Sequence, residues 1–263
     1  MLLPFSLMVQ KKTLLREFVT REIKGRFAGT AGGILWTVMS PLATIVSYFF
    51  VFSLVLRINV TIEETGTDKF AAFFLTGFFP WLMFADSLSK SVSVLLSEAS
   101  LITKVVFPVE LLPMSVVIST FAVNGIGFGL VLIYLVFTGH FSWFWAYLPV
   151  FLAIELLFAL GLSFFLSALN VFLRDTGEML GIVMMLWFFS TPVIYPCSMV
   201  PAEVSFLIDY NPMALFVNTF RDAVLMHQVS LMSILVLFIL SLISYSAGFW
   251  FFKKAKPAFG DVL

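Results

Sequence analysis

The chain has 263 residues, of which 61% are hydrophobic and 11% are charged, and its formal net charge at pH 7 is zero. Soluble domains carry about 25% charged residues, so this composition, with a mean hydropathy of +1.07, excludes an ordinary soluble domain and favours an integral membrane protein. The net charge argues against a nucleic-acid partner, and the single cysteine, Cys197, with only two histidines, excludes an intrachain disulfide and argues against a metal site.

The first predicted element is an amphipathic helix over residues 11–29. Apolar residues such as Leu14, Phe18 and Ile23 recur at helical spacing, and basic residues fill much of the remaining surface. Such a helix lies on a membrane with its apolar face in the lipid and its cations near anionic headgroups. The simpler alternative is a juxtamembrane anchor with no further role.

Long apolar intervals follow, and each is long enough to cross a bilayer, which takes about 20 residues. The sequence predicts six membrane-spanning helices, over residues 34–56, 70–96, 113–137, 143–169, 179–195 and 229–252. Gly25, Gly29 and Gly33 recur every four residues, which predicts a small-residue row where another helix approaches closely. The glycines of GIGFG, residues 125–129, are likewise interpreted as packing positions.

The segments between the spans are polar or broken by proline. Residues 98–112 predict a short helix and a proline-broken turn. Residues 196–228 predict one or two short helices that dip into the membrane boundary without crossing it.

Few charged residues lie inside the predicted spans. Asp86 and Lys90 are four apart and therefore share a helix face; a solvated pair near the inner surface is favoured over a functional one. Glu155 is a lone carboxylate in the fourth span, where a functional site and a structural hydrogen bond are both open.

The distribution of Lys and Arg sets the orientation, because cytoplasmic loops carry an excess of both. Twelve of the fifteen basic residues fall on the same side of the membrane as the amino terminus in this arrangement of spans. Arg57, Lys69 and Arg221 fall on the opposite side. Both termini are therefore expected in the cytoplasm, with residues 57–69 and 196–228 facing outward.

Motifs for chemistry are missing from the sequence. It holds no Walker A pattern, so the chain is not expected to hydrolyse ATP, and no nucleophile–base group stands out among its polar residues. Aromatic residues make up 17% of the chain, with 33 phenylalanines. Most are interpreted as interfacial or lipid-facing, although aromatic faces also offer sliding surfaces for sugar rings.

Four stretches together resemble one known family. REIKGRFAGTAGGILWTVMSPL (residues 21–42) resembles the opening of ABC-2 type permeases that export polysaccharides such as O-antigen, capsule or teichoic acid chains. GFFPWLMFADSL (77–88), ALNVFLRDTGEML (168–180), and STPVIYP with YNPMALFVNTFRDAVL (190–196 and 210–225) agree with the same family in the same order. The resemblance covers nearly the whole chain, 1–263, as a single transmembrane domain.

The resemblance implies an all-α subunit of six spans, with the amphipathic helix at its start and outward-facing gate helices between the fifth and sixth spans. It implies a homodimer in the bacterial cytoplasmic (inner) membrane, bound to two ABC ATPase subunits that hold ATP and Mg, with no cofactor in this chain. The complex would move a lipid-linked glycan outward, as in lipopolysaccharide biosynthesis.

Two groups of residues are assigned from these expectations. The channel lining is expected from aromatic residues of spans one, two and five: Tyr48, Phe52, Phe78, Phe79, Trp81, Phe84, Trp187, Phe188, Phe189 and Tyr195. Contact with the ATPase is expected from the amphipathic helix and residues 98–110: Arg16, Arg21, Lys24, Arg26, Glu98, Lys104 and Glu110.

Two other functions remain open at this point. The first is an ABC-2 permease for a lipid or a drug. The second is a membrane assembly subunit without a transport path. The identity of the glycan, its lipid carrier and its chain length are not encoded in any motif of this chain.

Overall fold

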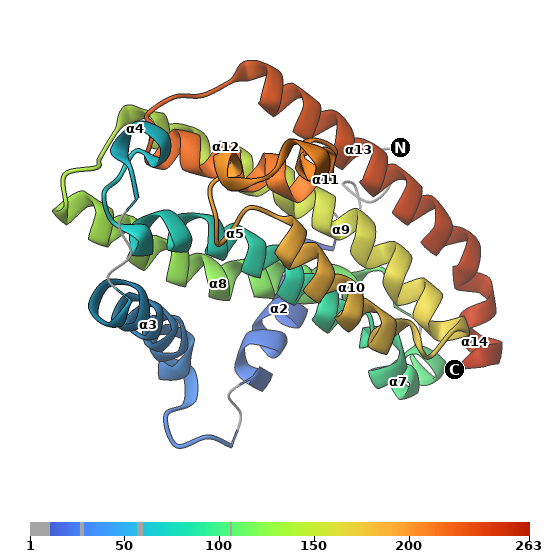
Figure 1. The fold of residues 1–263 in the computed structure, drawn as a ribbon. Helices are drawn as coiled ribbons and strands as arrows, with labels where there is room; N and C mark the ends of the chain where they lie inside the picture. Colours follow the sequence, from blue (N-terminus) through green and yellow to red (C-terminus); the bar gives the residue numbers. More distant parts are fainter. Residues whose placement is uncertain (1–10, 27–28, 57–59, 106) are drawn as a thin grey trace.

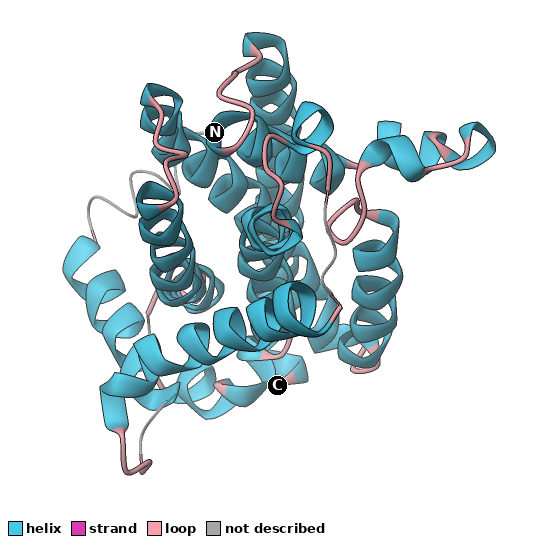
Figure 2. Cartoon of the chain, turned by 60° about the vertical axis from the view of Figure 1, so that its left-hand side comes forward, coloured by secondary structure: helices cyan, strands magenta, loops and turns pink. Residues whose placement is uncertain are grey.

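The computed structural model describes residues 11–26, 29–56, 60–105 and 107–263, and within them the chain is helical with no strand (Figures 1 and 2). This confirms the all-α prediction for the described part of the chain. The helices are α2 (Lys12–Arg26), α3 (Trp36–Phe49) with its π-helical continuation η2 (Phe50–Val55), α4 (Ile62–Thr65), α5 (Phe70–Ser91), α6 (Val94–Ser97), α7 (Ala99–Lys104), α8 (Leu111–Phe137), α9 (Leu148–Phe172), α10 (Thr176–Ser190), α11 (Phe206–Asp209), α12 (Pro212–Val224), α13 (Leu231–Ala255) and α14 (Phe259–Val262).

Five helical stretches in the described residues are long and apolar enough to cross a membrane: Trp36–Val55, Phe70–Ser91, Leu111–Phe137, Trp143–Phe172 and Leu231–Ala258. They coincide with five of the six predicted spans. The second prediction was too long, because α5 ends at Ser91 and a separate short helix, α6, follows.

Helix α5 is the centre of the bundle. It packs against α8, α9 and α12, and 78% of its most apolar window is buried, as expected for a helix that is hydrophobic on all sides. Helix α3 lies at the edge of the bundle, opposite α13 (Figure 1), and only 6% of its apolar window is buried. The first span therefore leaves most of its apolar surface uncovered in the single chain.

Helices α9 and α13 pack with almost no space between their backbones. A Cβ built on Gly248 would lie 1.9 Å from the carbonyl oxygen of Gly161, and one on Gly161 would lie 2.3 Å from the backbone of Ser244. Only glycine allows this approach, which is typical of helix pairs in membranes. The ring contacts Phe164–Phe252 and Phe172–Phe259 continue the same register, so α9 and α13 run parallel.

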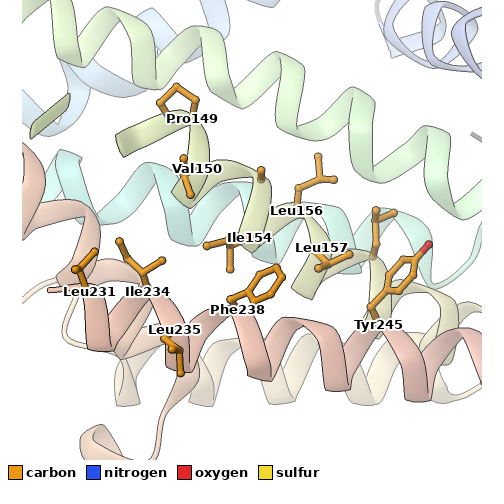
Figure 3. Close-up of a pocket in the computed structure, with 12 residues that line it drawn as sticks. Pro149, Val150, Ile154, Leu156, Leu157, Leu231, Ile234, Leu235, Phe238 and Tyr245 are labelled. Carbon is orange, nitrogen blue, oxygen red and sulfur yellow. The ribbon is translucent and has the colours of Figure 1, made fainter. Parts of the chain in front are cut away.

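Toward their amino-terminal ends the same two helices diverge. The gap is an apolar groove of about 900 Å³ lined by residues of both helices, and Figure 3 shows Ile154 of α9 and Phe238 of α13 close together within it. Its wall is almost entirely aliphatic or aromatic, in keeping with a surface that faces lipid.

Parallel α9 and α13 require the chain to return across the bundle between Phe172 and Leu231. Helix α10 begins this return but has only 15 residues, about 22 Å at 1.5 Å per residue, against a hydrocarbon core of about 30 Å. The predicted fifth span, 179–195, is therefore only partly helical, because α10 ends at Ser190. Six helical spans are not confirmed.

The segment predicted to dip into the membrane boundary has two different parts. Short 3-10 turns, Cys197–Met199 and Ala202–Val204, and helix α11 carry exposed side chains, among them Tyr210 just after α11. Helix α12 instead packs against α5, α9 and α13, with Phe216, Val217 and Phe220 fully buried. The second part belongs to the core of the bundle.

The predicted glycine row is wrong. Gly29 and Gly33 have positive φ angles, 78° and 48°, so they turn the chain between α2 and α3 and share no helix face with Gly25. The GIGFG prediction is right at Gly127 alone, where an added Cβ would clash with Phe79 and Pro41. Gly125 and Gly129, in contrast, face open space. The short helix and turn predicted over 98–112 are present as α7 and the loop that leads to α8.

Candidate functional site

Aromatic residues form one cluster where α3 and its continuation meet α5. Tyr48 lies 4.6 Å from Phe74 and 5.1 Å from Phe78, measured between ring centroids, and Phe52 lies 5.0 Å from Phe74. These rings join α3 and its continuation to α5, while α3 itself packs mainly against α8.

A second aromatic cluster lies farther along α5, where α10 and α9 pack against it. The Trp81 ring centroid lies 5.5 Å from Phe188 and 6.3 Å from Trp187, and Phe84 lies 5.2 Å from Trp187. Phe84 also stacks on Phe158 of α9 at 5.6 Å. This cluster joins α10 to the core.

The predicted channel residues are thus divided between two packing clusters within one chain. Phe79 and Phe84 have no exposed surface, and Trp81 is 5% exposed. Phe189 is 60% exposed on α10, and the Tyr195 hydroxyl donates to its carbonyl oxygen at 2.7 Å. The aromatic lining therefore stays a prediction, and it concerns an assembly of more than one chain.

Asn211 fixes the point at which α10 ends. Its side-chain oxygen accepts hydrogen bonds from the indole of Trp187 at 2.8 Å and from the backbone of Met213, where it caps α12. Its amide nitrogen donates to the Ser190 carbonyl and the Thr191 hydroxyl. One buried amide thereby connects the last turn of α10 with the first turn of α12.

Arg221 fixes the turns that follow α10. The side chain is 5% exposed, and its guanidinium donates to the carbonyl oxygens of Phe73, Pro192 and Val193. It also lies 3.6 Å from the centroid of the Phe73 ring, a cation–π contact. Gly77 of α5 leaves the space for it, because a Cβ there would lie 2.6 Å from the guanidinium.

Sequence reasoning missed both polar residues. The sequence placed Arg221 among the cations on the outer side of the membrane. The structure shows that its side chain is buried inside the bundle, and the side of the membrane on which it lies stays a prediction. The available signals were Asn-Pro, which commonly starts a helix, and an arginine on the otherwise apolar face of α12, which requires buried acceptors.

The predicted ATPase-contact residues fall into exposed and engaged groups. Arg16, Lys24 and Lys104 are exposed. Arg21 pairs with Glu98 at 2.5 Å, and Glu110, which is 6% exposed, accepts from Lys256 at 2.7 Å. Arg26 turns inward and donates to Ser119 and Thr120 of α8. The contact with an ATPase stays a prediction.

The remaining charged residues of the predicted spans differ in environment. Asp86 and Lys90 form the expected pair at 2.7 Å, with side chains that are 33% and 43% exposed. Glu155 is fully buried, and neither carboxylate oxygen has a hydrogen-bond partner among the described residues, so the structural hydrogen bond left open above is not found. The described residues contain no group of three or more His, Cys, Asp or Glu side chains that could hold a metal ion.

Comparison with known proteins gives a consistent result. The family described as "ABC-2 type transporter" matches residues 13–225. Two proteins of Klebsiella pneumoniae named "O-antigen export system permease protein RfbA" are each 30% identical over 257 residues, 95% of this chain and 95% of theirs. A protein of the same name from Myxococcus xanthus is 32% identical over 222 residues, 83% of each chain. The resemblance seen in the sequence is therefore confirmed: this chain belongs to the ABC-2 type transporter membrane family.

Proposed function

We propose that this chain is the membrane-spanning half of an ATP-driven exporter that moves a lipid-linked polysaccharide of the O-antigen class across the bacterial cytoplasmic membrane. The observation that carries the proposal is the match to permeases named for O-antigen export over 95% of both chains. The long apolar helices agree with a membrane location.

ATP hydrolysis is assigned to a separate subunit. The sequence has no Walker A pattern, so two copies of an ABC ATPase would bind ATP and Mg and act on a homodimer of this chain. The exposed cations of α2 and the segment 98–110 are proposed as their contact surface.

The transport path is proposed at the interface between two copies. Helices α3 and α10 flank α5 and expose large apolar side chains, among them Trp36, Leu186 and Phe189. A second copy would cover this surface, and aromatic faces along it would let sugar rings slide without a fixed charge.

Six crossings with both termini in the cytoplasm complete the proposal. Helix α10 and the turns after it, which Asn211 and Arg221 hold by hydrogen bonds, would make the fifth crossing. The parallel course of α9 and α13 supports this crossing. The short turns and α11, beside the end of that crossing, would act as the gate helices.

Deletion and complementation in the host test the function. Loss of the chain is expected to remove the polysaccharide from the cell surface while its lipid-linked precursor accumulates inside. An unchanged surface glycan with altered lipid or drug efflux would favour the other ABC-2 activity. A reconstituted complex that hydrolyses ATP but moves no substrate would favour an assembly subunit.

The proposed ATPase contact has its own test. Charge reversal at both Arg16→Glu and Lys24→Glu is expected to reduce copurification of the ATPase subunit several-fold and to leave the thermal stability of the purified chain unchanged, because both side chains are exposed. Lys69→Glu, an exposed cation beside α4, is the matched control. Retention of the ATPase in the double variant would contradict the assignment.

A further inference from the structure

A polar pocket of about 440 Å³ lies where α2, α3, α5 and α8 meet. It combines charged and hydrogen-bonding side chains with an apolar wall, and its lining residues are Arg26, Ser40, Pro41, Thr44, Phe79, Leu82, Asp86, Lys90, Val123 and Asn124. Phe79, a predicted channel residue that contacts Phe78, is among the lining residues of this pocket.

The lining carries two cations and one anion. Lys90 donates to Asp86 Oδ2 at 2.7 Å, and Asn124 donates to the same oxygen at 3.3 Å. Arg26 forms no ion pair within the described residues, and the contacts it makes to Ser119 and Thr120 both use Nη2. Asp86 is thus engaged by Lys90 and Asn124, and the lining keeps one positive charge in excess.

Burial makes that excess charge costly. Burial lowers the pKa of the Arg26 guanidinium. The negative charges of Asp86 on α5 and of Glu22, one turn before Arg26 on α2, raise it. Glu22 does not line the pocket. A second anion between Arg26 and Lys90 would balance the lining and would receive charge-assisted hydrogen bonds.

The depth of the pocket suits a lipid headgroup. Helix α8 has 27 residues and spans about 40 Å, about 10 Å more than a hydrocarbon core. Its first two turns can therefore stand outside the hydrocarbon, which places Ser119 and Thr120 near the boundary.

We propose that this pocket binds a phosphate or diphosphate group, and that in the transporter the group is the one that joins the polysaccharide to its lipid. The identity of the lipid rests on the proposed function, whereas the phosphate chemistry rests on Arg26, Lys90 and the hydroxyl and amide groups around them. Arg26 and Lys90 bind the anion, and Asp86 limits how tightly it is held.

Binding to the purified full chain in phosphatidylcholine nanodiscs tests the proposal. The probes are geranylgeranyl diphosphate, geranylgeraniol and inorganic pyrophosphate. We expect the lipid diphosphate to bind at least about tenfold more tightly than the alcohol, and Arg26→Met and Lys90→Met each to weaken it about tenfold. Lys253→Met, an exposed cation of α13, is the matched control and should bind normally.

Asp86→Asn separates an electrostatic role from a structural one. Removing the competing carboxylate is expected to raise affinity for geranylgeranyl diphosphate several-fold, whereas a merely structural pair would give loss of binding or of folded protein. Normal binding by both methionine variants, or equal binding of the alcohol, overturns the proposal. Equal affinity for inorganic pyrophosphate would support the phosphate chemistry and overturn the lipid as its source.

The outcome is distinguishable from failure of the proposed function. If deletion of the chain leaves the surface polysaccharide intact, the exporter assignment fails even where the phosphate probe binds at Arg26 and Lys90. If export depends on the chain and the two methionine variants bind and export normally, the pocket assignment alone fails.

Discussion

At the scale of single residues, Arg221 is a buried cation held by backbone groups. It donates to three backbone carbonyl oxygens and stacks on Phe73, and no carboxylate forms an ion pair with it within the described part of the chain. Buried acceptors that lose their donor cost about 1–3 kcal/mol each. The residue therefore matters for the position of the segment after α10 more than for any charge on the surface.

Arg221→Met is expected to lower the free energy of unfolding by at least about 2 kcal/mol, measured as a fall in melting temperature of the detergent-solubilised chain. Arg221→Lys should recover only part of the loss, since one ammonium cannot reproduce the planar guanidinium. Arg174→Met, at an exposed arginine, is the control and should melt like the parent. Equal melting temperatures for the two methionine variants would show that the three carbonyls do not need Arg221.

At the scale of elements, the closest contact is the one between α9 and α13. Gly248→Ala would bring a Cβ within 1.9 Å of the Gly161 carbonyl, and the helices can accommodate it only by separating. We expect a loss of about 1–3 kcal/mol, the usual cost of overpacking, again read from the melting temperature. Gly181→Ala on α10 meets open space and should be neutral or slightly stabilising. A neutral Gly248→Ala would mean that the two backbones are not held this closely.

The helices also show which parts of the fold can be predicted from the sequence. The long apolar runs predicted five helices within a few residues of their ends, because length and hydropathy are local properties. The early end of α10 depends on Asn211 and Arg221, which are 20 or more residues away in sequence, so no local pattern contains it. The glycine row failed because a spacing of four does not reveal the positive φ angles of Gly29 and Gly33.

The candidate site was read less completely than the fold. Aromatic content led to a predicted channel lining on α3, α5 and α10, which stays a prediction. Periodicity could not tell which of these rings face into the core of the single chain, where Phe79 and Phe84 are fully buried. The Asp86–Lys90 pair was predicted correctly from its spacing. Its neighbours Arg26 and Asn124 come from other helices, and only the tertiary structure brings them together.

At the scale of the whole molecule, the orientation can be tested on the natural sequence. Cys197 is the only cysteine and is exposed, and the proposed topology places it outside the cytoplasmic membrane. A membrane-impermeant maleimide is therefore expected to label the chain in intact spheroplasts, and Cys197→Ser should abolish labelling. With Lys104→Cys added to that variant, labelling should appear only after the membrane is broken. Labelling of residue 104 in intact spheroplasts would reverse the topology.

Two ion pairs connect the ends of one short segment to both ends of the described chain. Glu98 is joined to Arg21 near the start of the chain, and Glu110 is joined to Lys256 near its finish. The 13 residues from Glu98 to Glu110 are thus joined by ion pairs both to α2 and to the end of α13. An ATPase docked on this stretch, as proposed above, would therefore contact a segment that is ion-paired both to α2 and to Lys256, directly after α13.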